Sequence, residues 1–264
     1  MMKSAELIDG RTLAQQWRDD IAVQVRALNV PLGLAAVCVG GDDALRAFVK
    51  IKEKAAASVG VEFSNYFIDA DDEQSARKTL AYLAGDDSVH GIFVELPLPV
   101  SWNSASFLSL IPAVKDVDAL TAHPLVPAPA VHALEYVCVA HDIAVNGMTA
   151  AVVGHGRLVG EPVAKWLHDA GAITTVINVD TTEPAKQCAE ADLVVTGVGR
   201  PGLVTADWIK EGAKVIDFGY SDGKGDVDAI SVKKKAGLLS PVPGGMGPLV
   251  VAAVLENLLK LATI

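Results

Sequence analysis

The feature that most constrains this chain is an apolar run leading into a glycine-rich turn. Residues 150–153 are small or β-branched, and Gly154, Gly156 and Gly160 follow with G-x-G-x-x-x-G spacing. The first glycine permits a tight turn, the second lets the backbone approach a phosphate, and the third allows a helix to pack on the strand. The segment therefore predicts a strand, turn and helix with a dinucleotide at the helix N-terminus, a plain turn being the alternative.

Short aliphatic runs alternate with helical patterns along the chain, which is typical of parallel α/β folds. An aromatic content of 5% within a hydrophobic content of 51% also favours the aliphatic core of such sheets. The predicted strands are 34–39, 62–67, 91–95, 150–153, 174–178, 193–196 and 214–218. The predicted helices are 10–28, 44–58, 73–84, 131–141, 160–170, 182–189, 205–210 and 247–261.

Prolines between residues 112 and 129 interrupt this alternation, and a strand–glycine–helix order restarts after residue 146. We therefore expect an α/β fold of two domains. Residues 1–145 would form the first domain together with 246–264, because the last helix could return to pack on it. Residues 146–245 would form a Rossmann-type dinucleotide-binding domain.

Composition excludes several classes of partner. The net charge of −10 argues against nucleic acid, which needs concentrated Lys and Arg. Cys38, Cys138 and Cys188 lie far apart in apolar surroundings, which predicts buried free thiols in a reducing compartment and no metal site. The N-terminal residues lack a secretory signal pattern, and no charge-free apolar run reaches the roughly 18 residues of a membrane span. We therefore expect a cytoplasmic protein without membrane partners.

Further residues are expected to line the dinucleotide. Asp180 follows the next predicted strand, where an acid would accept hydrogen bonds from ribose hydroxyls and repel a 2′-phosphate. This favours NAD over NADP, although His155 and Arg157 could hold a phosphate, and a solvated loop acid is the alternative. The expected cofactor-binding residues are Gly154, His155, Gly156, Arg157, Val159, Gly160, Asp180, Gly197, Val198 and Gly199.

The predicted helix at 44–58 carries Lys50, Lys52 and Lys54 at every second position. Lys50 and Lys54 share one helix face, and Lys52 points roughly the opposite way. A lysine on the inward side, beside apolar neighbours such as Phe48, would be partly desolvated, which lowers its pKa and allows it to move protons. An ordinary solvated basic helix is the alternative.

Three loops carry the other candidate residues. Glu95 ends an apolar strand ahead of a proline-rich loop, at the carboxyl end where α/β sites usually lie. Loop 115–118 holds Asp116 and Asp118, two acids that could bind an amino-pyrimidine ring. Residues 241–248 contain three glycines and three prolines, and such a rigid loop lets the backbone touch a flat ring or a phosphate. A tight turn before the last helix is the alternative there.

Taken together, these motifs resemble the bifunctional 5,10-methylenetetrahydrofolate dehydrogenase/5,10-methenyltetrahydrofolate cyclohydrolase (FolD) family over nearly the whole chain. The matching segments are 7–10, 94–99, 115–118, 152–154, 158–160, 225–228, 241–248 and 255–257. The resemblance implies that methylenetetrahydrofolate is oxidised with NAD(P) and that the product is hydrolysed to 10-formyltetrahydrofolate. It also implies a folate in the cleft between two domains, a homodimer, and a place in one-carbon metabolism and purine biosynthesis.

The resemblance also assigns residues. Lys52 matches the family's catalytic lysine, Phe48 stands at the position of its tyrosine, and Asp118 matches the acid that holds the pterin. Glu95 would act beside Lys52. The other residues implied to touch the substrate are Leu96, Pro97, Pro243, Gly244 and Gly245.

The chain departs from the family pattern at informative places. Glu95 replaces a glutamine that hydrogen-bonds the catalytic lysine, so we expect a carboxylate paired with Lys52 that raises the pKa of the lysine. Phe48 lacks the usual hydroxyl, and residues 178–180 replace a segment that supports the NADP phosphate. We therefore expect NAD to be favoured and cyclohydrolase activity to be weak or absent. A folate- or nucleotide-binding paralogue without turnover, and an amino-acid or shikimate-type dehydrogenase, are the alternatives.

Overall fold

The structure is a computed structural model that describes residues 4–41 and 43–264. It divides into two compact α/β units, so the predicted two-domain architecture is confirmed. The six-stranded unit comprises the residues up to Ala14 together with Ala130–Val250, and the three-stranded unit comprises Gln15–Pro129 together with Val251–Ile264. The predicted limits divide the chain by function, into a catalytic domain (1–145 and 246–264) and a dinucleotide-binding domain (146–245). These limits stay a prediction.

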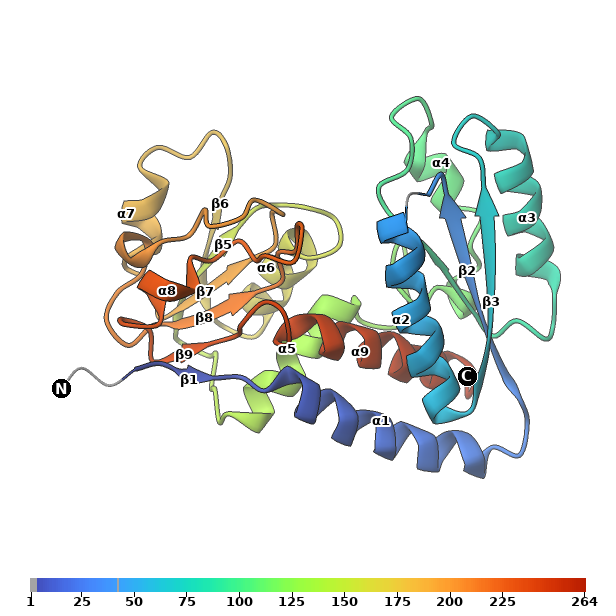
Figure 1. Ribbon diagram of the computed structural model, residues 1–264, viewed down its shortest axis with the longest axis horizontal. Helices are drawn as coiled ribbons and strands as arrows, with labels where there is room; N and C mark the ends of the chain where they lie inside the picture. Colours follow the sequence, from blue (N-terminus) through green and yellow to red (C-terminus); the bar gives the residue numbers. More distant parts are fainter. Residues whose placement is uncertain (1–3, 42) are drawn as a thin grey trace. The chain divides into compact units, whose positions relative to one another are not determined.

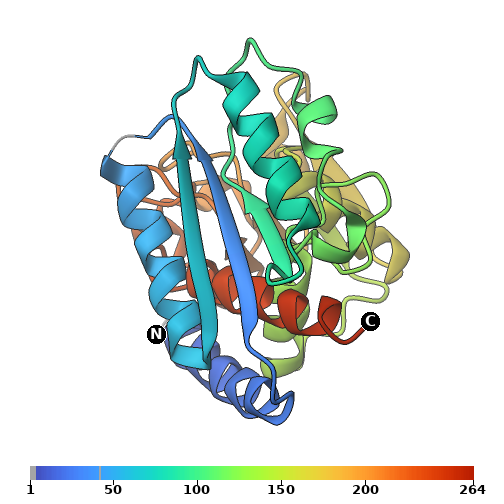
Figure 2. The same cartoon turned by 90° about the vertical axis from the view of Figure 1, so that its right-hand side faces the viewer.

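The three-stranded unit is a parallel sheet in the order β3-β2-β4 (Figures 1 and 2). Its central strand is buried along almost its full length, which explains why it contains only small and aliphatic side chains and one cysteine. Helix α2 connects β2 to its neighbour β3, and α3 connects β3 back across β2 to β4. The two crossovers run in opposite directions along the sheet, so their right-handedness places the helices on opposite faces. Its elements are β2 (Leu32–Val39), α2 (Asp43–Val59), β3 (Val61–Ile68), α3 (Glu73–Gly85), β4 (Gly91–Val94), α4 (Ser104–Leu108) and a 3₁₀ turn (Ala113–Lys115); α1 (Gly10–Ala27) enters it at Gln15.

The last helix, α9 (Met246–Leu261), belongs to this unit from Val251 onward. The Asn257 side-chain amide donates hydrogen bonds to the carbonyl oxygens of Val117 (2.9 Å) and Pro127 (2.8 Å). Helix and sheet pack so closely that a Cβ added at Gly91 would lie 2.7 Å from Leu258. The predicted return of the last helix to the first part of the chain is therefore confirmed.

The six-stranded unit is a parallel sheet in the order β1-β9-β8-β7-β5-β6. The interior strands β5, β7 and β8 are almost fully buried, which accounts for the continuous apolar runs that predicted them. Its elements are β1 (Glu6–Leu7), α5 (Pro129–Ala140), β5 (Thr149–Val153), α6 (Gly160–Asp169), β6 (Ile173–Ile177), α7 (Pro184–Cys188), β7 (Leu193–Thr196), a 3₁₀ turn (Ala206–Trp208), β8 (Lys214–Asp217), α8 (Ala229–Val232) and β9 (Leu238–Leu239).

Five short elements are absent from the sequence prediction: β1, β9, α4, α8 and the 3₁₀ turn Ala113–Lys115. Strands of two residues carry no alternation that a sequence could show, and both form because an existing strand offers them partners. The predicted helix at 205–210 is only a 3₁₀ turn. The three cysteines are buried free thiols, as predicted. Among the described residues, no helix combines the length and the hydropathy needed to cross a bilayer.

Candidate functional site

A charged cluster lies where α2 faces the end of β4 in the three-stranded unit. The structure places Lys52 on the inward side of α2, whereas Lys50 and Lys54 are exposed. The Lys52 Nζ donates a hydrogen bond of 2.6 Å to Glu95 Oε1, so the predicted ion pair is confirmed. The side chains of Lys52 and Glu95 are only 12% and 10% exposed, so the ion pair is largely shielded from water.

Aromatic rings enclose the same ammonium group. The Lys52 Nζ lies 4.2 Å from the ring centre of Phe93 and 4.9 Å from that of Phe48. Both rings are within the range of cation–π attraction, so they hold the lysine in a fixed direction. Phe93 was not among the predicted site residues because a buried strand aromatic reads as core, whereas Phe48, 43% exposed, is open to a ligand.

The two acids of loop 115–118 have different roles. Asp116 is fully buried and accepts hydrogen bonds from the backbone amides of Leu120 (3.0 Å) and Thr121 (2.7 Å). The prediction that both acids read a ring is therefore wrong for Asp116, whose acceptor capacity is used to hold the loop. Asp118 has no hydrogen-bonding partner among the described residues, so its carboxylate is available to a ligand.

The charge state of Asp118 is set by its surroundings. Burial raises the pKa of its carboxyl to about 7, and the Lys52 ammonium opposes this rise. The charges of Glu95 and Asp116 raise the pKa further. Lys52, Glu95 and Asp118 therefore form one electrostatic group, in which Asp118 titrates near neutral pH.

A pocket of about 240 Å³ adjoins this group. The lining residues are Val39, Gly41, Leu45, Glu95, Leu96 and Pro97. The lining side chains are aliphatic or proline apart from Glu95, which adds one carboxylate, and such a set can receive a flat heterocycle. Three predicted site residues, Glu95, Leu96 and Pro97, thus line one cavity.

The glycine-rich turn of the six-stranded unit has the geometry of a phosphate site. Gly154 follows β5 with φ +95°, and a Cβ at Gly160 would overlap the carbonyl of Gly154. Gly156 has open space around the position of a Cβ. The N-cap residue of α6, Val159, makes no side-chain capping hydrogen bond. The Glu161 amide donates to the Gly156 carbonyl at 3.0 Å and Pro162 has no N–H, so among the described residues the Gly160 amide is the one in the first turn of α6 that is left to an anionic ligand. The turn as a whole fits a dinucleotide pyrophosphate.

The loop after β7 lies against this turn. A Cβ at Gly197 would come within 2.7 Å of Val159, and one at Gly154 within 3.3 Å of Val198. Gly199 has φ +73°, so the loop turns where a side chain would be strained. The structure thus brings the residues 197–199 together with the glycine-rich turn at the carboxyl edge of the sheet.

The loop after β6 lies at the same edge, because β6 pairs with β5 in parallel. Asp180 is exposed there, and its backbone amide donates to the Asn178 side chain at 2.9 Å. His155 and Arg157 are also exposed. The role of Asp180 as a ribose ligand stays a prediction.

The predicted Pro–Gly–Gly loop is a compact turn. The Gly245 amide donates to the Pro241 carbonyl at 2.7 Å, and Gly244 has φ +99°. A Cβ at Gly10 would overlap the Gly245 carbonyl, so α1 begins directly against the loop. Pro243 is exposed at its tip. Gly244 is half-buried and Gly245 is buried, so the loop presents one ring and part of its backbone. Its contact with a ligand stays a prediction.

Sequence reasoning gave no role to two buried acids, Asp217 and Asp226. Asp217 ends β8 and accepts from the amides of Gly219 (2.7 Å) and Val227 (3.0 Å). Burial raises the pKa of its carboxyl to about 6, against the effect of these two amides. The segment 225–228 was part of the family resemblance, but only the fold shows that its first acid is buried.

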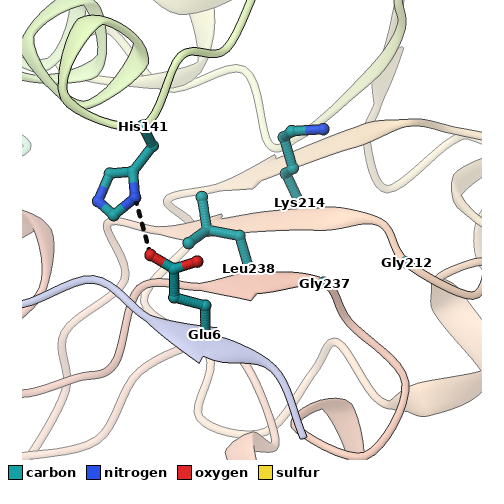
Figure 3. A pocket seen from close by; sticks show the side chains of 6 residues that line it. All are labelled: Glu6, His141, Gly212, Lys214, Gly237 and Leu238. Atoms are coloured by element: carbon teal, nitrogen blue, oxygen red, sulfur yellow. Dashed lines mark ion pairs between the residues drawn. The ribbon is translucent and has the colours of Figure 1, made fainter. Parts of the chain in front are cut away.

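A second cavity, of about 190 Å³, lies at the opposite edge of the six-stranded sheet (Figure 3). Its lining residues are Glu6, His141, Gly212, Lys214, Gly237 and Leu238. Glu6 and His141 point toward each other there, at 3.3 Å. Because β1, β8 and β9 begin at this edge, the cavity is remote from the carboxyl ends where the predicted site residues gather.

Comparison with known proteins agrees with this geometry. Residues 8–118 match the family model of the tetrahydrofolate dehydrogenase/cyclohydrolase catalytic domain, and residues 127–264 match that of its NAD(P)-binding domain. The bifunctional protein FolD of Staphylococcus haemolyticus is 36% identical over 276 residues, covering 97% of this chain and 96% of that protein. FolD of Bordetella bronchiseptica is 36% identical over 277 residues, covering 98% of each.

Solved structures show the same likeness. The Trypanosoma brucei FolD, solved with NADP and an inhibitor, has a TM-score of 0.93 and 30% identity, covering 99% of this chain and 98% of that one. The Campylobacter jejuni FolD has a TM-score of 0.90 and 31% identity, covering 98% of this chain and 99% of that one. This chain therefore belongs to the tetrahydrofolate dehydrogenase/cyclohydrolase family.

Proposed function

We propose that this protein oxidises 5,10-methylenetetrahydrofolate to 5,10-methenyltetrahydrofolate with NAD(P) and hydrolyses the product to 10-formyltetrahydrofolate. The observation that carries the proposal is the group formed by Lys52, Glu95 and Asp118 beside an apolar pocket. The same chain carries a turn that fits a dinucleotide pyrophosphate. Family membership supports both halves of the reaction.

Asp118 is the group best suited to hold the pterin. An aminopyrimidine ring presents adjacent N–H donors, and the Asp118 carboxylate has no competing hydrogen bond among the described residues. Leu96 and Pro97 line the pocket and would contact the flat face of the ring, and Phe48 is exposed next to Lys52. The carboxylate would fix the orientation of the ring, and the apolar residues would exclude water from it.

The six-stranded unit would hold the dinucleotide through its backbone. When bound, the nicotinamide ring accepts the hydride that leaves the methylene carbon of the substrate. Gly156 and the Gly160 amide at the start of α6 would hold the pyrophosphate, and Gly197, Val198 and Gly199 would support the rest of the cofactor. Pro243 and Gly244 would offer a side-chain-poor surface to the flat rings, and the buried Gly245 would hold the turn in shape.

Lys52 is the residue on which the hydrolysis step would depend. Water adds to the carbon between N5 and N10 and loses a proton as the C–O bond forms. The bond from that carbon to N5 then breaks, N5 takes a proton, and the new hydroxyl loses its proton as it becomes the formyl C=O. The Lys52 ammonium, directed by two aromatic rings, would position the water and stabilise the developing charge. Glu95 would fix the lysine through its 2.6 Å hydrogen bond.

A dehydrogenase without cyclohydrolase activity is the second candidate. The ion pair with Glu95 and the missing hydroxyl at Phe48 favour it, because both change the hydrogen bonds available to an attacking water. A folate- or nucleotide-binding paralogue without turnover has less support, since Lys52 and Asp118 are both retained. We further propose that NAD is favoured over NADP, on the exposed acid Asp180, and that the protein is a cytoplasmic homodimer in the one-carbon metabolism that supplies purine biosynthesis.

One assay tests these proposals. Purified protein is given methylenetetrahydrofolate with NAD or NADP, absorbance is followed at the wavelength of reduced nicotinamide and methenyl product, and acid quenching then separates retained from hydrolysed product. Turnover with both steps supports the bifunctional enzyme, and turnover without hydrolysis supports the second candidate. Faster reduction of NADP at equal concentration would contradict the NAD preference, and no turnover with either cofactor would leave only the paralogue.

A further inference from the structure

Asp226 is an acid whose burial the proposed reaction does not explain. It is fully buried in the six-stranded unit. Its Oδ2 accepts hydrogen bonds from the Thr196 hydroxyl (2.8 Å) and the Val198 amide (2.6 Å), and its Oδ1 accepts from the Arg200 amide (2.6 Å). These donors are a hydroxyl and two backbone amides, and each comes from the end of β7 or the loop that follows it. The Asp226 carboxylate thus accepts three hydrogen bonds from the end of β7 and the loop after it.

The loop held in this way is the one that lies against the glycine-rich turn. Val198, whose amide Asp226 accepts, is the residue that a Cβ at Gly154 would meet at 3.3 Å. Gly197, next to it, faces Val159 at the start of α6. The position of the loop relative to the proposed pyrophosphate site therefore depends on where Asp226 places these amides.

Asp226 is itself held firmly. Its carbonyl accepts from the Val204 amide (2.9 Å), and the amide of the next residue, Val227, donates to Asp217. Gly225 has no room for a side chain, because a Cβ there would overlap Asp217 and lie 2.8 Å from Val242. The segment is thus fixed between β8 and the loop that carries the Pro–Gly–Gly turn, and it can act as a rigid support.

We propose that Asp226 is a positioning residue for the dinucleotide: its carboxylate fixes the loop 197–200 in the conformation that receives the cofactor. The proposal rests on the proposed use of NAD(P). It predicts that loss of acceptor capacity at this position weakens dinucleotide binding without impairing the chemistry that depends on Lys52.

The test uses the whole protein and the variant Asp226→Asn. The amide keeps the shape of the side chain but replaces one acceptor oxygen by a donor, which would face an N–H or a hydroxyl. We expect the Kd for NADH and NADPH, measured by fluorescence titration, and the KM for the oxidised cofactor to rise about tenfold to a hundredfold. We expect kcat at saturating cofactor, and hydrolysis of added methenyltetrahydrofolate, to change less than about threefold.

Two further variants separate positioning from folding. Thr196→Val removes one donor without touching the carboxylate and should raise the same Kd about threefold, with Thr196→Ser restoring it. Asp228→Asn, the matched control, changes the neighbouring acid, which caps α8 through the Ile230 amide at 3.3 Å, and should leave the Kd unchanged. If Asp226→Asn fails to fold, Thr196→Val decides the question.

The outcomes distinguish the two proposals. A wild-type protein that binds neither NADH nor NADPH would overturn the proposed function. A wild-type protein that binds cofactor, with unchanged Kd in both Asp226→Asn and Thr196→Val, would overturn the positioning role alone. Equal losses of cofactor binding and methenyl hydrolysis, with a lowered melting temperature, would also overturn it, because a purely structural residue affects both units alike.

Discussion

The two candidate regions of this protein are built on opposite principles. The cluster of Lys52, Glu95 and Asp118 consists of charged side chains from three separate segments, gathered beside an apolar pocket. The edge that holds the glycine-rich turn consists of backbone, at positions such as Gly160 where an added side chain would collide. Substitutions in the first region should therefore change chemistry at little cost in structure, and substitutions in the second should change geometry.

The largest effect is expected when the Lys52 ammonium is removed from the charged cluster. Lys52→Met keeps the apolar stem but leaves water without its ammonium partner, so hydrolysis of methenyltetrahydrofolate should fall by about 10²-fold or more. The rate is followed by the loss of methenyl absorbance. Lys50→Met and Lys54→Met are matched controls on the exposed face of the same helix and should retain hydrolysis. A Lys52→Met protein that hydrolyses at the normal rate would contradict the assignment.

The second region is tested by adding one methyl group. In Gly160→Ala the new Cβ overlaps the Gly154 carbonyl, so the turn must shift, and the affinity for NAD(P)H should fall about tenfold or more with a lower melting temperature. In Gly156→Ala the Cβ has open space, so the melting temperature should stay within about 2 °C. Affinity should still fall, because the methyl group stands where the phosphate approaches. Unchanged affinity in both variants would remove the turn from the cofactor site.

Asp118→Asn tests whether the unpartnered acid binds substrate. Loss of a charged hydrogen bond should raise the KM for methylenetetrahydrofolate about tenfold. In the wild type the KM should fall as the pH rises through about 7, because only the ionised carboxyl accepts from both N–H groups of the ring, and the variant should lose this dependence. A KM profile that is the same in both proteins would show that Asp118 does not touch the substrate.

The Asp118 carboxyl should also make the folding stability of the protein depend on pH. Its pKa in the folded state lies above the ordinary value of 3.8, so its contribution to folding is greatest below that pH and is lost as the pH rises through about 7. Melting temperatures between pH 5 and pH 8 should therefore fall less steeply in Asp118→Asn than in the wild type.

The smallest expected effect concerns Glu95. Glu95→Gln keeps an oxygen that can accept from Lys52 but removes the negative charge, so hydrolysis should rise about threefold to tenfold if the carboxylate restrains the lysine. Dehydrogenase turnover should change less than about twofold. Hydrolysis that falls in this variant would show instead that the carboxylate assists the water, which would sharpen the role of the first region.

The sequence was most informative where a residue type has few uses. Glycines at 154, 156 and 160 predicted the turn because their spacing has one geometric purpose, and the helical period set Lys52 apart from its neighbours. The residue pattern alone could not separate Asp116 from Asp118, because two acids in one loop differ only in which backbone amides the fold brings to them. Only the family resemblance assigned the pterin to Asp118. The burial of Asp226 was likewise beyond prediction, since the donors to its carboxylate lie 26 to 30 residues away.

The hydrogen bonds of Asn257 have a consequence for how the chain acquires its structure. Asn257 closes on the Val117 carbonyl across 140 residues, so the loop that carries Asp118 is fastened by a segment made long after it. Synthesis proceeds at roughly 5–20 residues per second, so several seconds pass while Ala130–Val250 is made. Only after that can Asn257 donate its hydrogen bonds to the loop. Pairing across such a separation is slow, because loop-closure entropy is lost before the contact forms. The three-stranded unit should therefore complete its folding after the six-stranded one.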